Sequence, residues 1–208
     1  MHQKQTVLAG KPLSEADKAV IFIHGRGGSA EDILGLSRQL NVKNYALLAP
    51  QATTNSWYPL SFLAPIQQNE PGLSSAISII SDLVTEINNA GINSSNIYFV
   101  GFSQGACLSL EFVTRHARSW GGVAAFTGGL IGDKIYTEHY QGDFAGTSVF
   151  IGTSDPDSHV PVERVNATTK LMQSLNAKVT EKIYPNMGHT IIKDEIDLAN
   201  ELIFKEGT

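Results

Sequence analysis

Six short apolar runs, separated by helical patterns, constrain the fold more than any other feature of the chain. Most of them are continuously apolar rather than alternating, which is typical of strands covered on both faces of a sheet. Residues 5–9 are expected to add an edge strand. The alternation predicts βαβ units, and therefore an α/β fold with a mainly parallel, twisted sheet and helices on both faces. The six runs lie at residues 19–23, 45–49, 96–100, 122–126, 148–152 and 178–184.

The stretches between the runs repeat apolar residues at helical spacing, most clearly within residues 76–87, 162–172 and 192–203. Ser29, followed three residues later by Asp32, resembles an N-cap with an acidic first turn, so a helix is expected to start there. The 208 residues contain no internal repeat and no linker that would divide them. A single domain spanning residues 1–208 is therefore expected.

Two segments, residues 50–72 and 127–146, do not fit this alternation. Loops of such length in a compact domain are usually functional. Both follow predicted strands, and ligands of open α/β sheets bind beyond the carboxyl ends of the strands. Each segment is a candidate part of a binding site, and a plain surface connection is the alternative.

Charge and cysteine content narrow the range of partners. The net charge is −5 and the 15 Lys and Arg residues are scattered, which disfavours binding to nucleic acid or to an acidic membrane surface. Cys107 is the single cysteine, so an internal disulfide and a cysteine-rich metal site are both excluded. No run has the length of a signal peptide or a membrane span. We expect a cytoplasmic protein without stable membrane insertion.

The segment Gly101-Phe102-Ser103-Gln104-Gly105 lies between a predicted strand and a predicted helix at residues 106–116. The G-x-S-x-G pattern alone arises by chance, but a preceding strand and a following helix are what a nucleophile elbow requires. The glycines permit the sharp turn by removing Cβ atoms that would clash with neighbouring backbone. Ser103 is therefore the candidate nucleophile.

A serine hydroxyl needs a base to take its proton, and a histidine base works best when a carboxylate fixes its tautomer. In an elbow of this kind, the chain order is serine, then the acid, then histidine. His139, His159 and His189 follow Ser103 at sufficient distance. His189 is the preferred base, because it lies between the strand at residues 178–184 and the last predicted helix.

Two aspartates compete for the acidic position. Asp155 and Asp157 both follow the strand at residues 148–152, and spacing alone does not separate them. One can orient His189 while the other caps the helix that begins near Pro161. Both can also be turn residues, since Asp and Pro favour turns.

An acyl-transfer site also needs backbone N–H donors in place before the reaction. One is expected from Gln104, and the second from the glycine-rich loop His24-Gly25-Arg26-Gly27-Gly28. A phosphate-binding loop is the competing interpretation. It lacks support, because no lysine follows in the P-loop pattern and no G-x-G-x-x-G is completed.

These segments together resemble the phospholipase/carboxylesterase family of α/β-hydrolases, small serine esterases without a large lid domain that include acyl-protein thioesterases. The resemblance extends from residue 21 to residue 189 in the family order. It implies the α/β-hydrolase fold, Ser103 as nucleophile, His189 as base, and the backbone N–H groups of Arg26 and Gln104 as the oxyanion hole. The matching segments are FIHGRGGSAEDI, LLAPQATTNSWYP, GFSQGA, SDPDSHVPVERV and NMGH.

The acidic segment of the family usually reads Asp-x-x-Val-Pro, with the aspartate four positions before the proline. Asp157 stands in that relation to Pro161, so the resemblance favours Asp157 over Asp155. Ser158 is a departure, because many relatives have proline at this position.

The segment NSWYP resembles the part of the family that borders the acyl pocket. Trp57, Tyr58 and Phe62, together with Leu63, are therefore expected to bind substrate, and packing against the sheet is the alternative for each. Cys107 lies one helical turn after Ser103 and is expected to be buried filler rather than a second nucleophile. Related dienelactone hydrolases use cysteine at the position where this chain has serine.

We therefore expect a serine carboxylesterase that acts on a small-molecule ester and needs no metal or other cofactor. Acyl thioesterase or lysophospholipase-type activity with the same three residues is an alternative within enzymes. A catalytically silent binding protein with the same fold is the alternative outside them. The sequence leaves the acyl chain length and the oligomeric state open.

Overall fold

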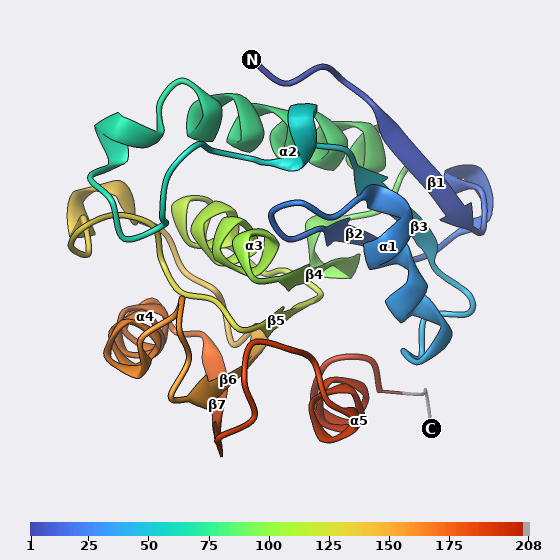
Figure 1. Cartoon of the computed structure of the whole chain (residues 1–208). Coiled ribbons are helices and arrows are strands. Elements are labelled where there is room, and N and C mark those ends of the chain that lie inside the picture. Colours follow the sequence, from blue (N-terminus) through green and yellow to red (C-terminus); the bar gives the residue numbers. More distant parts are fainter. Residues whose placement is uncertain (206–208) are drawn as a thin grey trace.

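A seven-stranded sheet forms the centre of the molecule, and in the computed structural model its strands follow the order β1-β3-β2-β4-β5-β6-β7 (Figure 1). The structure describes residues 1–205. Neighbouring strands are parallel except for β1 and β3, which are antiparallel. The predicted mainly parallel α/β fold is thus confirmed. The strands are Thr6–Gly10 (β1), Ala19–Ile23 (β2), Ala46–Pro50 (β3), Ile97–Phe102 (β4), Gly122–Phe126 (β5), Ser148–Asp155 (β6) and Lys178–Pro185 (β7).

Within the described residues, five α-helices cover both faces of the sheet (Figure 1). Side chains of α2, α3 and α4 pack in one hydrophobic core, and those of α1 and α5 pack in the other. Strand β2 shows why both faces are needed, because Ile21 and Ile23 belong to the first core and Val20 and Phe22 to the second. The helices are Ala30–Leu34 (α1), Gly72–Asn89 (α2), Gln104–Arg115 (α3), Val162–Ser174 (α4) and Lys193–Leu202 (α5).

The first helix begins where the N-cap pattern predicts. The Ser29 hydroxyl accepts a hydrogen bond from the backbone N–H of Asp32, and the Asp32 carboxylate accepts one from the N–H of Ser29. This reciprocal pair is a capping box, which satisfies two of the N–H groups that a helix start leaves unpaired. Helix α1 then continues into a 3₁₀ turn at Gly35–Arg38.

Strand β6 is longer than the apolar run that predicts it, because it extends through Asp155. Thr153 and Ser154 are polar but fully buried, so a pattern based on apolar residues ends too early there. The register of β6 with β7 continues to the pair Asp155 and Pro185. The extension carries the chain directly to the acidic segment that follows.

Edge strand β7 departs from the pattern of a doubly covered strand. Most of its residues are exposed or half-buried, and only Tyr184 is buried. An edge strand lies at the margin of the covering helices, so its solvent-facing positions tolerate polar side chains.

The two long segments that interrupt the alternation lie close to each other in space. Each contains short 3₁₀ turns, at Thr53–Asn55 and Ile66–Asn69 in the first and at Thr137–His139 in the second. The backbone N–H of Gly132 in the second segment donates to the carbonyl of Phe62 in the first, at 2.7 Å.

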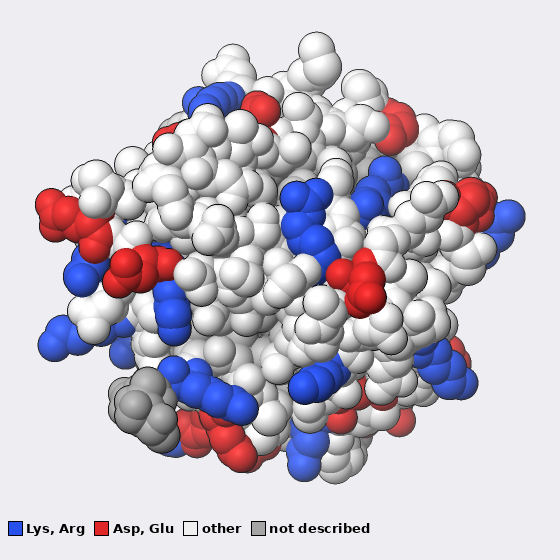
Figure 2. All heavy atoms as spheres, turned by 180° about the vertical axis from the view of Figure 1, so that it is seen from behind, with Lys and Arg blue, Asp and Glu red and all other residues white. Residues whose placement is uncertain are grey.

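Charged side chains of both signs are interspersed on the surface, and neither sign gathers into one patch on the face shown in Figure 2. Within residues 1–205, no helix has the length and apolar character needed to cross a membrane.

Candidate active site

Ser103 occupies a sharp turn between β4 and α3. Strand β4 ends at Phe102 and α3 begins at Gln104, so one residue reverses the direction of the chain. Its backbone angles are φ 54° and ψ −118°, in a region that residues other than glycine rarely adopt. Such a conformation persists only when the surroundings fix it. Here the N–H of Ser103 donates to the Phe126 carbonyl at 3.0 Å, and its carbonyl accepts from the Cys107 N–H at 2.9 Å.

The two glycines that flank the turn are required by close backbone contacts. A Cβ atom on Gly101 would overlap the backbone of Gly105, and a Cβ on Gly105 would overlap the carbonyl of Ile23 at the end of β2. The first contact lets α3 start directly above the end of β4. The second brings the loop after β2 against the turn that carries Ser103.

The structure brings Ser103, His189 and Asp157 together from three separate loops. His189 Nε2 lies 2.8 Å from Ser103 Oγ, and His189 Nδ1 lies 2.9 Å from Asp157 Oδ2. Asp157 follows β6 and His189 follows β7, so both reach Ser103 from the carboxyl edge of the sheet. This is the order of contacts in which a base accepts a serine proton while a carboxylate orients that base.

The Asp157 carboxylate is held by further hydrogen bonds. Its Oδ1 accepts from the backbone N–H groups of His159 at 2.7 Å and Val160 at 2.8 Å. Burial favours the neutral acid, but the hydrogen bonds from the His159 N–H, His189 and the Val160 N–H outweigh it and lower the pKa of Asp157. The carboxylate is therefore charged at neutral pH although its side chain is fully buried.

The competing residues are not part of this series of hydrogen bonds. Asp155 is exposed, and within residues 1–205 its side chain makes no hydrogen bond to His189. His139 stacks on Tyr136 in the 3₁₀ turn of the second long segment, with ring centroids 5.4 Å apart. His159 lies against the edge of His189, with ring centroids 4.8 Å apart and planes at 74°.

The two residues expected to supply oxyanion donors have their backbone N–H groups available. Within the described part of the chain, the N–H groups of Arg26 and Gln104 donate no hydrogen bond. In the same glycine-rich loop, by contrast, Gly27 donates to Asn55 and Gly28 donates to Gly25. The Gln104 N–H lies at the first position of α3, where the helix dipole favours negative charge.

A cleft of about 720 Å³ opens beside Ser103 and His189. This volume is within the range of small-molecule sites, whose walls are mostly apolar with a few polar groups. Of the residues expected to contact substrate, Tyr58, Phe62 and Leu63 line it. The remaining apolar lining consists of Pro59, Leu60, Phe102, Cys107, Val160 and Pro161.

Trp57, which was also expected to contact substrate, is not among the residues that line the cleft. Its side chain is fully buried, and the indole N–H donates to the His24 carbonyl at 2.9 Å. The indole belongs to the hydrophobic core that also contains side chains of α2 and α3, which agrees with the packing alternative for Trp57.

The sequence model of the family described as Phospholipase/Carboxylesterase matches residues 5–205. The chain belongs to this family. A solved phospholipase/carboxylesterase from Dyadobacter fermentans DSM 18053 is 51% identical to it, with a TM-score of 0.97 over 98% of each chain.

Two further relatives show more distant similarity. A probable carboxylesterase SOBER1-like protein of Arabidopsis thaliana is 28% identical over 200 residues, which are 88% of this chain and 76% of that protein. Acyl-protein thioesterase 1 of Gibberella zeae is 24% identical over 216 residues, or 93% of this chain and 92% of that protein. The expected enzyme class, hydrolases of ester bonds, is confirmed at this level.

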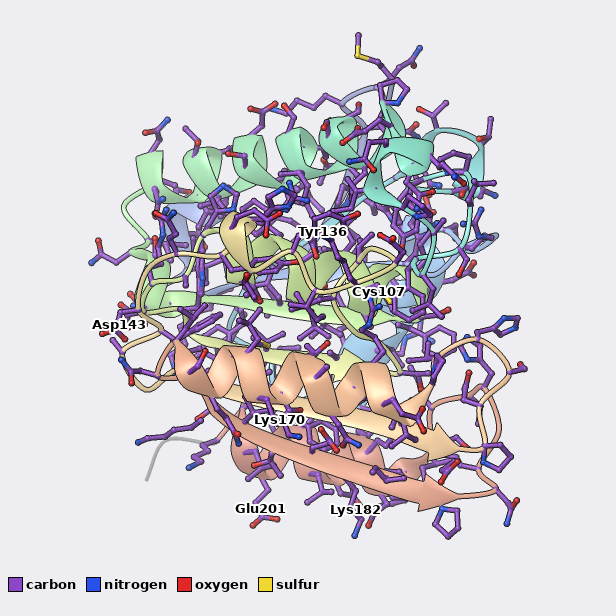
Figure 3. All side chains as sticks on the ribbon, turned by 90° about the vertical axis from the view of Figure 1, so that its left-hand side faces the viewer. Cys107, Tyr136, Asp143, Lys170, Lys182 and Glu201 are labelled. Atoms are coloured by element: carbon purple, nitrogen blue, oxygen red, sulfur yellow. The ribbon has the colours of Figure 1, made fainter. Side chains whose placement is uncertain are left out.

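In this member of the family, Cys107 is a packing residue at the base of the cleft. It lies in the interior, whereas Lys182 and Glu201 lie at the margin of the molecule (Figure 3). Burial is the main cause that raises the pKa of its thiol to about 12, despite an opposing hydrogen bond with the Gly129 backbone. The thiol stays protonated at neutral pH, as expected for a buried filler.

Sequence reasoning missed the side chains of Arg26 and Gln104. Both were expected to contribute only backbone N–H groups, yet both side chains bind the segment that walls the cleft. No local pattern announces these contacts, because the partners are more than 30 positions apart in the sequence.

The side chains of residues 1–205 were considered as metal ligands. No group of three or more His, Cys, Asp or Glu side chains lies together as metal ligands would.

Proposed function

We propose that this protein is a serine carboxylesterase, which hydrolyses a small carboxylic ester through an acyl-enzyme on Ser103. The observation that carries the proposal is the continuous series of contacts from Ser103 Oγ through His189 to the buried Asp157 carboxylate. Ser103 lies at the cleft end of this series and lines a mostly apolar cleft, where an acyl group can lie next to the hydroxyl.

In the first half-reaction, His189 Nε2 accepts the Ser103 proton while Oγ attacks the ester carbonyl carbon. The resulting oxyanion accepts hydrogen bonds from the N–H groups of Arg26 and Gln104. Asp157 stabilises the imidazolium through Nδ1. When the C–O bond to the alcohol breaks, His189 returns its proton to the leaving oxygen.

In the second half-reaction, His189 takes a proton from water, and the hydroxide attacks the acyl carbon of the Ser103 ester. The proton then returns to Ser103 Oγ as the carboxylic acid leaves. Each oxyanion donor of this type contributes about 3 kcal/mol to stabilising the transition state.

The test is hydrolysis of p-nitrophenyl acetate and butyrate by the wild-type protein and by Ser103→Ala. The substitution is expected to lower kcat/KM by more than about a thousandfold. Ser119→Ala is the matched control, because Ser119 is exposed and remote from the cleft-lining residues. Equal rates for wild type and Ser103→Ala would overturn the proposal.

A fluorophosphonate probe separates the enzyme from a silent binding protein of the same fold. It forms a covalent bond only with an activated serine, so it is expected to label the wild-type protein and not Ser103→Ala. Failure to label the wild-type protein would favour the binding protein.

An acyl thioesterase is the second candidate, favoured by the similarity to the acyl-protein thioesterase of Gibberella zeae over 93% of this chain. It would use the same three side chains. Comparing kcat/KM for an oxygen ester and a thioester of one acyl chain decides between the two, because only the leaving group differs.

A further inference from the structure

One side of the cleft is formed by residues 57–63, here called the cleft wall. Except for Trp57, every residue of the cleft wall lines the cleft. The wall has no helix or strand of its own, because it lies between the 3₁₀ turns Thr53–Asn55 and Ile66–Asn69. Its backbone polar groups therefore need partners from other parts of the molecule.

The Arg26 guanidinium supplies partners for three of the cleft-wall carbonyls. Its Nη1 donates to Ser56 Oγ at 2.8 Å and to the Pro59 carbonyl at 3.0 Å. Its Nη2 donates to the Tyr58 carbonyl at 2.9 Å and to the Leu60 carbonyl at 2.6 Å. One side chain thus gathers three consecutive carbonyls of the cleft wall and the hydroxyl that precedes it.

These contacts replace an ion pair. Within residues 1–205, no carboxylate lies within ion-pair distance of Arg26. The guanidinium is a planar fork of fixed geometry, which suits it to several acceptors at once, whereas a lysine ammonium is a point charge on a flexible stem. The arrangement of acceptors around Arg26 therefore requires arginine rather than any cation.

Two amide side chains bind further backbone groups of the cleft wall. Gln104 accepts from the Trp57 N–H at 2.9 Å and donates to the Tyr58 carbonyl at 2.9 Å. Asn69, fully buried, accepts from the Leu60 N–H and donates to the Ser61 carbonyl, both at 2.9 Å. The cleft wall is consequently preformed and attached to the turn and loop that flank Ser103.

We propose that the Arg26 side chain is a positioning group that fixes the cleft wall relative to the oxyanion loop, and so sets the length of acyl chain that the cleft accepts. This inference rests on the proposed esterase function. Arg26 contacts the wall with its side chain and would contact the oxyanion with its backbone N–H. Displacement of the wall by an ill-fitting acyl chain is therefore transmitted to the group that stabilises the transition state.

The first test measures local opening of the cleft wall in the absence of substrate. Arg26→Met keeps the backbone N–H and much of the aliphatic bulk but removes all four hydrogen bonds. Amide hydrogen exchange in a peptide covering residues 57–63 is expected to become at least about tenfold faster, because exchange reports local opening. Exchange in α2 is expected to stay unchanged. Unchanged exchange in the cleft wall would overturn the positioning role.

The second test measures selectivity between acyl chains of different length. The kcat/KM values for p-nitrophenyl esters of two to twelve carbons define the longest acyl chain that the wild-type enzyme accepts well and the next one that it rejects. In Arg26→Met, the ratio between these two is expected to fall by about tenfold, the size of discrimination that one or two methylenes provide in an apolar pocket. The fall should appear in kcat as well as in KM.

Two further variants complete the design. Arg26→Lys keeps the charge without the planar fork and is expected to recover only part of the selectivity. Arg118→Met is the matched control, since Arg118 lies over the ring of Trp120 away from the cleft, and its selectivity should equal that of wild type. A chain-length profile in Arg26→Met that matches wild type would contradict the inference.

The outcomes separate the two proposals. A wild-type protein without ester hydrolysis refutes the esterase function, while the exchange experiment still decides whether Arg26 holds the cleft wall. If Arg26→Met does not fold, Arg26→Lys carries both measurements, and wild-type exchange together with a wild-type profile would overturn the inference.

Discussion

Gly105 in the first turn of α3 lies directly against the carbonyl of Ile23 at the end of β2, with no room between them for a Cβ atom. The contact joins two parts of the proposed site, because Gln104 precedes Gly105 and the loop with Arg26 follows Ile23. The two expected oxyanion donors are thereby held by backbone packing. The glycine of the elbow motif acts at this contact as well as at the turn.

Gly105→Ala is therefore expected to destabilise the protein by about 1 to 3 kcal/mol, as overpacking of a close contact does. It should also lower kcat, because the backbones carrying the two N–H donors must separate. Urea unfolding and ester kinetics measure the two effects. Gly35→Ala is the control, because nothing lies within 4 Å of its Cβ position and its φ of −54° suits alanine. A Gly105→Ala protein as stable as Gly35→Ala would contradict the packing argument.

Asp157→Asn is expected to lower kcat by about ten-thousandfold, as loss of the orienting carboxylate does in a serine protease. The amide can present its N–H₂ group to His189 Nδ1, which favours the wrong tautomer. Asp155→Asn should keep activity close to wild type, because the Asp155 side chain is exposed and does not contact His189. Kinetics of the two variants with p-nitrophenyl butyrate would show an equal loss only if the assignment of Asp157 is wrong.

Glu195 predicts a dependence of stability on pH that does not involve the proposed chemistry. It is fully buried in α5, its Oε2 accepts from the Ile192 N–H, and within residues 1–205 its Oε1 has no partner. Burial is the main cause that raises its pKa from 4.5 to about 7, with a smaller contribution from the charge of Asp194 and an opposing one from the Ile192 N–H. The native state then binds the proton more tightly than the unfolded state does.

The stability supplied by protonated Glu195 is therefore complete below pH 4.5 and is lost as pH rises through 7. Glu195→Gln removes this loss, so its free energy of unfolding relative to wild type should rise by on the order of 2 kcal/mol between pH 5 and pH 9. Denaturant unfolding at several pH values measures the difference. Glu201→Gln, an exposed change on the same helix, should show no such trend. A flat difference for Glu195→Gln would disprove the pKa shift.

Cys107 should resist alkylation in the folded protein. Its thiol is buried and has a pKa raised to about 12, so very little thiolate forms at pH 8. Iodoacetamide is expected to label it only after unfolding, as mass spectrometry can show. Rapid labelling of the native protein at pH 8 would contradict its role as a packing residue.

The sequence predicts the fold well because both faces of the central strands are buried. Continuous apolar runs such as Ala19–Ile23 predict the buried strands, and the glycines around Ser103 predict a turn. The apolar pattern ends too early where a buried strand carries polar side chains. Thr153 and Ser154 are fully buried within β6, so their polar side chains end the predicted strand too early.

In the candidate site, features that depend on neighbouring residues in the chain could be predicted, and contacts between distant residues could not. The preference for His189 rests on its position after a strand, and the preference for Asp157 rests on the family resemblance of the segment that ends at Pro161. Both depend on local order in the chain. The burial of Trp57 and the contacts of the Arg26 side chain depend on residues about 30 positions away. Nothing in a single sequence specifies that a guanidinium will face carbonyls rather than a carboxylate.

The backbone of Ser103 has a consequence for the stability of the whole enzyme. With φ at 54°, the residue stays in a conformation that only glycine adopts without cost. Ser103→Gly should therefore unfold at a higher temperature than Ser103→Ala, by a difference of about 1 kcal/mol in unfolding free energy. The hydroxyl of the proposed nucleophile is thus attached at a position where the backbone conformation disfavours it. A glycine variant that is more stable at this position is expected to lack the proposed activity.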